Sequence, residues 1–186
     1  MYILASSSPR RKSLMSQIVN DFKIDPADID ETTSYKFSPL EATRDISYRK
    51  GEVIAKKYPD DIVISADTIV VIDNKIIGKP KDAEDAIRML KLLSNRTHEV
   101  ITAYSIFYKD IKLTHDVHSF VTFNKLDDEM IEEYVASKSP LDKAGAYGVQ
   151  DNEQYHIIKE VKGSLNNVIG FPVEEIKKDL EDLHLL

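Results

Sequence analysis

The chain has 186 residues, enough for one domain with a sizeable core, and it carries a net charge of −7 with 42% hydrophobic and 31% charged residues. It contains no Cys, which excludes disulfides and thiolate metal sites and leaves oxygen or His ligands for any metal. The acidic balance argues against a nucleic-acid duplex as partner, and no apolar run approaches the roughly 20 residues of a membrane helix. Since the N-terminus also lacks an export signal, we expect a cytoplasmic protein.

The N-terminal segment begins with a short strand over residues 2–5, followed by three serines. Ser8 is a favourable N-cap, and Pro suits the first helical position, so we predict a helix from Pro9 to about Ile18. Arg10 and Arg11 therefore fall in the first turn, where the helix dipole disfavours cations. Hydroxyls, backbone amides and guanidiniums at a helix N-terminus commonly hold phosphate, and a solvated Arg pair is the alternative.

A long second helix is predicted after the polar segment 21–38. We expect this segment to be a loop or an extended edge, with Glu31 in a solvated acidic cluster. Ser38 and Glu41 form a capping box, so the helix begins there and lasts to about Lys57.

The apolar face of this helix is predicted from Ile46, Val53 and Ile54, which recur at three- and four-residue spacing. Lys50 falls on the same face, and an inward Lys needs an anionic partner. The alternative is a Lys that extends its ammonium to the surface.

The most informative stretch runs from Ile62 to Pro80. Two β-rich apolar runs, 62–64 and 69–72, predict a buried strand, and Asp67 lies between them. A carboxylate there loses several kcal/mol of hydration unless cations or donors compensate it, so we expect a divalent metal or a Lys beside it. A structural Asp bound by backbone amides is the alternative.

This strand continues into a predicted hairpin. Asp73 and Asn74 provide the turn, 75–77 is the return strand, and Lys79 follows it between Gly and Pro.

The rest of the chain alternates helices, strands and loops. We predict a helix capped by Asp82 over 83–93 with Ala83 on its buried face, a hairpin of 100–108 and 113–123, a helix from Asp127 to about Ser137, a strand over 155–161, a polar turn over 163–167 and a C-terminal helix from Pro172. His98, His115 and His118 show no metal-binding spacing and are expected to be surface or sheet residues. The Gly-rich loop SPLDKAGAYGVQ, which ends at Gln150, permits close approach of backbone to a ligand.

Together these elements predict an α/β fold, a mixed twisted sheet flanked by helices, forming two lobes around a central cleft within one domain over 1–186. A site at strand ends in that cleft would collect several cations and few carboxylates. The candidate residues are Arg10, Arg11, Lys50, Asp67 and Lys79. Such a set suits a polyphosphate held partly by Lys and Arg and partly through a metal.

The motifs LASSSPRRKSLM, SADTIVV, GKPKDAEDA, LDKAGAYGVQ and GSLNNVIGFPV resemble, in order and spacing, those of the Maf family of nucleoside triphosphate pyrophosphatases, also called septum formation inhibitors. The resemblance implies a Maf/ITPase-like fold, hydrolysis of a nucleoside triphosphate to the monophosphate and pyrophosphate, a divalent cation (Mg²⁺ or Mn²⁺), a cytoplasmic location and a homodimer. It makes Asp67 the catalytic acid and a metal ligand together with Glu31. Its further pocket residues are Ser6, Arg10, Arg11, Lys50 and Lys79.

The sequence departs from the family pattern at a few positions. Ser7 and Asp151 stand where Gly is usual, Gly78 where a larger residue is common, and Leu165 where an aromatic is usual.

Within the family the loop resembles that of the branch that prefers dTTP and UTP, with Arg10, Thr68 and Gln150 at its specificity positions. Gln offers a donor and an acceptor, which match N3 and a carbonyl of uracil or thymine, modified pyrimidines included. Alternatives are a Gln150 that only packs the loop of a broad-specificity pyrophosphatase, and a nucleotide-binding regulator of cell division that does not hydrolyse its ligand.

Overall fold

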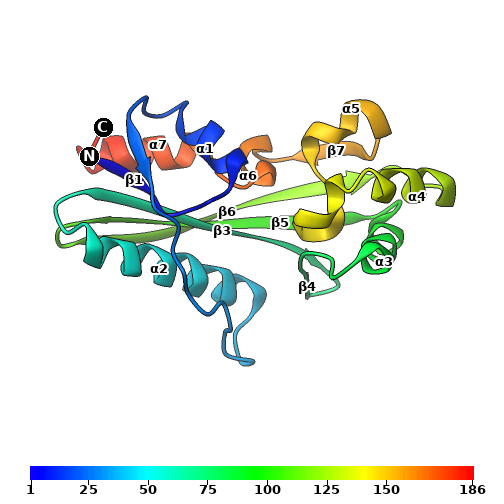
Figure 1. Ribbon diagram of the computed structural model, residues 1–186, viewed down its shortest axis with the longest axis horizontal. Helices are drawn as coiled ribbons and strands as arrows, with labels where there is room; N and C mark the ends of the chain where they lie inside the picture. Colours follow the sequence, from blue (N-terminus) through cyan, green and yellow to red (C-terminus); the bar gives the residue numbers. More distant parts are fainter. The chain divides into compact units, whose positions relative to one another are not determined.

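The computed structural model describes residues 1–186 and forms a seven-stranded mixed sheet flanked by helices (Figure 1). The strands are β1 (Tyr2–Leu4), β2 (Phe22–Ile24), β3 (Ile62–Ile72), β4 (Lys75–Ile77), β5 (Thr97–Tyr108), β6 (Ile111–Phe123) and β7 (Ile158–Lys162). The helices are α1 (Pro9–Met15), α2 (Pro39–Lys57), α3 (Ala83–Leu93), α4 (Asp128–Ala136), α5 (Asn152–Tyr155), α6 (Leu165–Ile169) and α7 (Val173–Asp182). The strand order is β2-β1-β3-β5-β6-β7, with β4 paired to β3, which confirms the predicted mixed sheet.

The chain divides into two compact units, as the prediction of two lobes anticipated. Unit 1 contains residues 1–68, 101–117 and 165–186, and unit 2 contains residues 69–100 and 118–164. The long strands β3, β5 and β6 contribute residues to both. A single domain over 1–186 stays a prediction.

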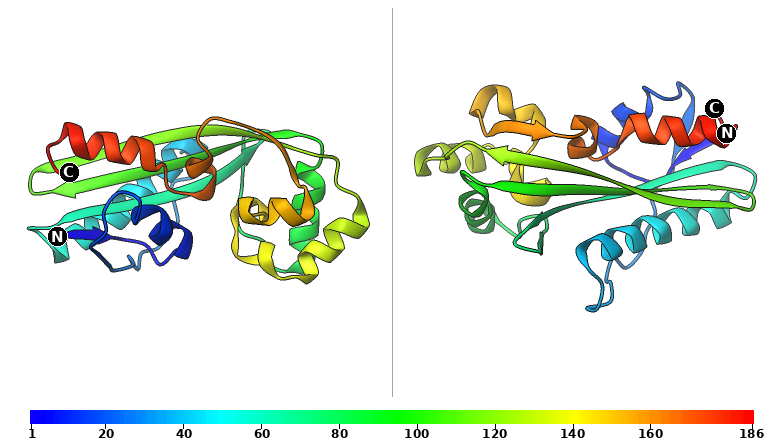
Figure 2. Two further views of the ribbon diagram at one scale, coloured as in Figure 1. Left: turned by 90° about the horizontal axis from the view of Figure 1, so that it is seen from above. Right: turned by 180° about the vertical axis from the view of Figure 1, so that it is seen from behind.

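In unit 1 the sheet separates α2 on one face from α1 and α7 on the other (Figures 1 and 2). Strand β1 runs parallel to both β2 and β3, with Tyr2 opposite Ile62. Because side chains alternate along a strand, Leu4 and Ile64 pack towards α1 and α7 whereas Val63 packs towards α2. This alternation fixes the side of the sheet to which each polar residue of β3 points.

Unit 2 is built on the β3–β4 hairpin and the helices α3 and α4. Asp73 and Asn74 both have positive φ, 50° and 58°, the conformation of a type I′ turn, which confirms the predicted hairpin. The Gly-rich loop forms three short 3-10 turns, η1 (Ser139–Asp142), η2 (Ala144–Ala146) and η3 (Val149–Asp151). Helix α3 packs against α4, η1 and η2.

Helix starts follow the predicted caps. Ser8, Asp82 and Asp127 each accept a backbone N–H with their side chains, and Ser38 and Glu41 form both bonds of the capping box.

Several predicted boundaries are wrong. Helix α1 ends at Met15, residues 152–155 are helical ahead of β7, the turn 163–167 includes the start of α6, and Ala83 is exposed. The segment 21–38 contains the edge strand β2, which agrees with the expected extended edge. Strand β2 is three residues long and is stabilised by parallel pairing with β1, a non-local contact, so the sequence did not define its bounds.

No helix combines the length and apolar character needed to cross a membrane.

Candidate active site in unit 1

Asp67 lies in the buried middle of β3 with only 8% of its surface exposed. Its Oδ2 accepts a hydrogen bond of 2.7 Å from the hydroxyl of Thr43, which is fully buried on α2. The neighbouring Ser65 points the same way, because its hydroxyl donates to the carbonyl of Ser47 on α2. The carboxylate of Asp67 therefore faces α2.

Lys50 provides the cation beside this carboxylate. Its Nζ lies 3.4 Å from Asp67 Oδ1 and 2.8 Å from Glu31 Oε1, and only 14% of its side chain is exposed. Thr43 and Lys50 are seven residues apart, two helical turns, so they project from the same face of α2. The prediction of an inward Lys with an anionic partner is confirmed, and the partners of Asp67 are side chains, not backbone amides.

The close approach of α2 to the sheet depends on small residues. A Cβ at Gly51 would lie 2.4 Å from the Phe107 ring and 2.6 Å from the Ser65 hydroxyl. The predicted apolar face is wrong at Val53, which is 43% exposed. The buried residues are Ala42, Thr43, Ser47, Gly51 and Ile54. A face of small and hydroxyl residues lets the helix lie near enough for Thr43 and Lys50 to reach Asp67.

Arg11 occupies the opposite face of the same strand. Its Nε donates to the Gly170 carbonyl at 2.9 Å, Nη2 to the Thr68 hydroxyl at 3.1 Å and Nη1 to the Ser6 hydroxyl at 3.4 Å. Three of the five N–H donors of a guanidinium are thus engaged, and two remain for a ligand. The structure brings Ser6, Arg11 and Thr68 together.

The two faces are coupled electrostatically although they lie on either side of β3. Burial lowers the pKa of Arg11, and the carboxylate of Asp67 raises it in opposition; Arg10 lowers it further and Glu31 raises it. Arg10 lies in the first turn of α1, as predicted, and is partly buried. Positive charge is therefore concentrated around a strand that carries one buried carboxylate.

The remaining predicted site residues belong to unit 2. Lys79 and Gln150 are both exposed, Lys79 after β4 and Gln150 in the turn η3. His98 is buried in β5, which confirms its expected place in the sheet, and its Nε2 lies 2.6 Å from the Tyr147 hydroxyl.

The donor set around Asp67 fits a divalent cation of the Mg²⁺ or Mn²⁺ kind. The carboxylates of Asp67 and Glu31 both contact the ammonium group of Lys50. Two carboxylate oxygens that could act as metal ligands therefore lie close to the same point. No group of three or more His, Cys, Asp or Glu residues forms a closed metal site. Mg²⁺ is commonly held by one or two carboxylates and completed by water and substrate phosphates, and this arrangement matches that pattern.

Two residues that hold the site were missed by the sequence reasoning. The sequence does contain a signal for Thr43, because it lies two helical turns before Lys50 and so on the same face of α2. The face predicted from Ile46, Val53 and Ile54 did not include Thr43. The Gly170 carbonyl gives no local signal, because it reaches Arg11 across 159 residues of chain.

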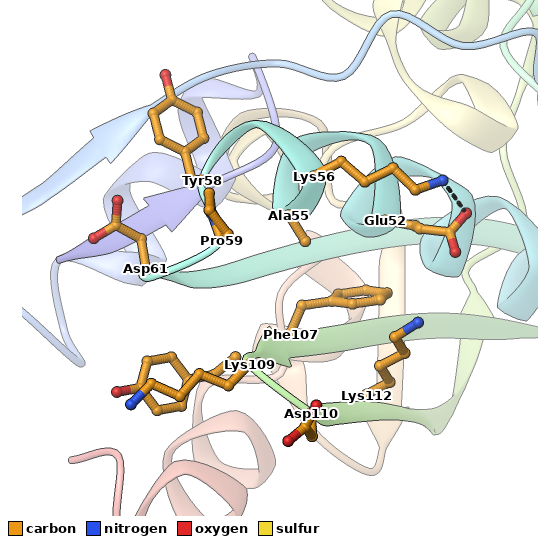
Figure 3. A pocket seen from close by; sticks show the side chains of 11 residues that line it. Glu52, Ala55, Lys56, Tyr58, Pro59, Asp61, Phe107, Lys109, Asp110 and Lys112 are labelled. Carbon is orange, nitrogen blue, oxygen red and sulfur yellow. Dashed lines mark ion pairs between the residues drawn. The ribbon is translucent and has the colours of Figure 1, made fainter.

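A pocket of about 340 Å³ also exists in unit 1, near the end of α2 and the β5–β6 turn (Figure 3). It is lined by Glu52, Ala55, Lys56, Tyr58, Pro59, Asp61, Phe107, Tyr108, Lys109, Asp110 and Lys112. None of these is a predicted site residue, and its Lys56 is paired with Glu52 at 3.3 Å. We therefore assign the candidate site to Asp67 and its neighbours and not to this pocket.

Solved structures similar to this fold include the Ham1 protein of Staphylococcus aureus, with a TM-score of 0.58 at 14% identity over 98% of both chains. A HAM1 protein from Coxiella burnetii has a TM-score of 0.55 at 15% identity, over 97% of this chain and 98% of that one. At these identities the likeness concerns the fold alone.

Proteins found by sequence comparison have a much higher identity to this chain than these solved structures do. A dTTP/UTP pyrophosphatase of Ruminiclostridium cellulolyticum is 43% identical over 185 residues, covering 98% of this chain and 95% of the relative. Another protein with that name, from Acholeplasma laidlawii, is 38% identical over 187 residues, covering 100% of this chain and 98% of the relative. Residues 1–183 match the family described as Maf-like protein. The chain therefore belongs to the family of Maf-like proteins.

Proposed function

We propose that this chain is a hydrolase that cleaves dTTP and UTP between the α and β phosphates, releasing the nucleoside monophosphate and pyrophosphate. Relatives named dTTP/UTP pyrophosphatase at 38–43% identity over nearly the full chain support this activity. The structural observation that carries it is Asp67, a buried carboxylate bound by Thr43 and Lys50 on a strand whose other face carries Arg11.

In the proposed reaction Asp67 orients the attacking water and accepts its proton as the oxygen approaches the α-phosphorus. Thr43 and Lys50 hold the two carboxylate oxygens, so the carboxylate keeps one orientation during the attack. A divalent cation held by Asp67 and Glu31 would supply positive charge to the phosphate oxygens and acidify water.

Negative charge that develops on the leaving pyrophosphate is neutralised by the cations. Arg11 is oriented by its hydrogen bonds to Gly170, Thr68 and Ser6, which leaves two of its N–H donors for phosphate oxygens. Arg10, Lys50 and Lys79 supply further positive charge.

Base selection is assigned to Gln150 with Arg10 and Thr68. The Gln150 amide presents a donor and an acceptor that pair with N3 and a carbonyl of uracil or thymine. A site built to bind one base edge rejects another strongly, because its own polar groups would be left unpaired. Modified pyrimidine triphosphates that keep this edge are substrates in the same class. The cytoplasmic location and the homodimer stay predictions.

The test is an assay of individual triphosphates with Mg²⁺ or Mn²⁺ in which pyrophosphate and orthophosphate are measured separately. We expect pyrophosphate as the product, with UTP and dTTP cleaved well ahead of CTP, ATP and GTP. Gln150→Ala should reduce the difference in rate between these two groups of nucleotides. Equal rates on all five nucleotides would instead indicate a broad-specificity pyrophosphatase. Binding without turnover would indicate a nucleotide-binding regulator.

A further inference from the structure

The segment that carries Gln150 is tied to one buried hydroxyl. Tyr134 of α4 accepts a hydrogen bond of 3.1 Å from the Gly148 backbone N–H and donates one of 2.7 Å to Asp151 Oδ2. The backbone N–H of Asp151 in turn donates to the Gly148 carbonyl at 3.1 Å. The residues on both sides of Val149 and Gln150 are therefore held by a single oxygen atom.

The Tyr134 side chain is buried and packed on both its ring and its hydroxyl group. Tyr134 is fully buried, and its ring packs on that of Tyr155 with centroids 4.6 Å apart. Burial and the hydrogen bond to Asp151 raise the pKa of the Tyr134 phenol, so the hydroxyl keeps its proton and remains a donor. Ser139 donates a second hydrogen bond of 2.7 Å to the same oxygen of Asp151. The carboxylate thus has two donors and one fixed position.

The Gln150 amide rests against Gly148. A Cβ at Gly148 would lie 3.0 Å from both Cδ and Nε2 of Gln150 and 2.8 Å from Cε of Lys143. The backbone at Gly148 is extended, with φ −128°, a conformation that any residue can adopt. Gly is therefore required here because a side chain would collide with its neighbours, and not because of an unusual backbone conformation. Gln150 is exposed, and its side-chain amide lies close to the backbone that Tyr134 holds.

We propose that Tyr134 and Asp151 are positioning residues for base selection, a hydroxyl-to-carboxylate latch that fixes the Gln150 segment before a pyrimidine triphosphate binds. The inference rests on the proposed function, because it assigns base recognition to Gln150. Preorganisation of this kind lowers the ordering cost of binding, and its loss acts on KM and selectivity more than on kcat.

The test compares Tyr134→Phe with Tyr155→Phe. The first removes the hydroxyl that joins Gly148 to Asp151 and leaves the ring, whereas the second removes a hydroxyl that makes no hydrogen bond to the segment. For Tyr134→Phe we expect the ratio of kcat/KM for UTP over CTP to fall about tenfold, mainly through the KM for UTP. For Tyr155→Phe we expect the wild-type ratio. Amide hydrogen exchange over residues 148–151 should accelerate in Tyr134→Phe alone.

A second pair keeps the proposal testable if Tyr134→Phe folds poorly. Asp151→Asn retains a carbonyl oxygen that accepts from Tyr134, so its UTP over CTP ratio should lie near that of wild type. Asp151→Ala removes the acceptor, and its ratio should fall as in Tyr134→Phe. If folded Tyr134→Phe and Asp151→Ala both keep the wild-type ratio and exchange rates, the latch is refuted. A wild-type protein that does not distinguish UTP from CTP would refute the base selectivity in the proposed function instead.

Discussion

The hydrogen bond from Thr43 to Asp67 provides a test of how the catalytic carboxylate is held. Thr43→Val replaces the hydroxyl by a methyl group of similar size and leaves Asp67 Oδ2 without its 2.7 Å donor. Hydrogen bonds to charged groups contribute about 1.5–3 kcal/mol, so the free energy of unfolding should fall by about 2 kcal/mol and Tm by about 4–8 °C. Thr43→Ser keeps the donor and loses one buried methyl group, which costs about 1 kcal/mol.

Turnover separates the two variants more clearly than stability does. If Thr43 orients the carboxylate, Thr43→Val should lower kcat for UTP about tenfold, which corresponds to about 1.4 kcal/mol, while Thr43→Ser keeps most of it. Thermal melts give Tm and steady-state pyrophosphate release gives kcat, both measured on the same preparations. Equal kcat values for folded Val and Ser variants would refute the view that this hydrogen bond orients Asp67.

Two further predictions concern packing and pH. Gly51→Ala should destabilise the protein by about 1–3 kcal/mol in denaturant titrations despite the better helix propensity of Ala, because the new Cβ collides with Phe107 at 2.4 Å. Gly78→Ala, with nothing within 4 Å of the new Cβ, is its control, and equal stabilities would contradict the tight packing of α2. Burial lowers the pKa of His98 from 6.5 to about 4, so the unfolded chain binds the proton more readily between these values. The stability that His98 contributes as a neutral residue is therefore complete above pH 6.5 and is lost as pH falls towards 4, by up to about 3 kcal/mol. His98→Phe should make the free energy of unfolding depend less on pH between about 4 and 6.5. The same pH dependence as in wild type would contradict the view that buried His98 causes this loss of stability.

The sequence was most informative where local chemistry decides the structure. Ser38 and Glu41 fix the start of α2, and Asp73 and Asn74 fix the β3–β4 turn, because caps and type I′ turns depend on a few adjacent residues. Strand β2 has no such signal, since its three residues gain their hydrogen bonds from β1.

The candidate site divides in the same way. Asp67 and Lys50 were predicted as a buried carboxylate and an inward cation, because burial of either charge demands a partner. The alternation of β3 that places Asp67 and Thr68 on opposite faces was implicit in the sequence. The Thr43 hydroxyl donates to Asp67 and the Gly170 carbonyl accepts from Arg11. Both contacts depend on how closely α2 and the C-terminal segment pack, which the local sequence pattern does not specify.

The central claim is that Asp67 carries the hydrolysis of UTP and dTTP at the α-phosphorus. The most direct measurement compares wild type, Asp67→Asn and the exposed control Asp110→Asn with UTP, quantifying pyrophosphate and orthophosphate separately in protein shown to be folded by thermal melts. We expect wild type and the control to release pyrophosphate at similar rates, and Asp67→Asn to lose roughly a hundredfold or more of turnover while remaining folded. Near-normal turnover in Asp67→Asn, or orthophosphate as the product of the wild-type protein, would contradict the account.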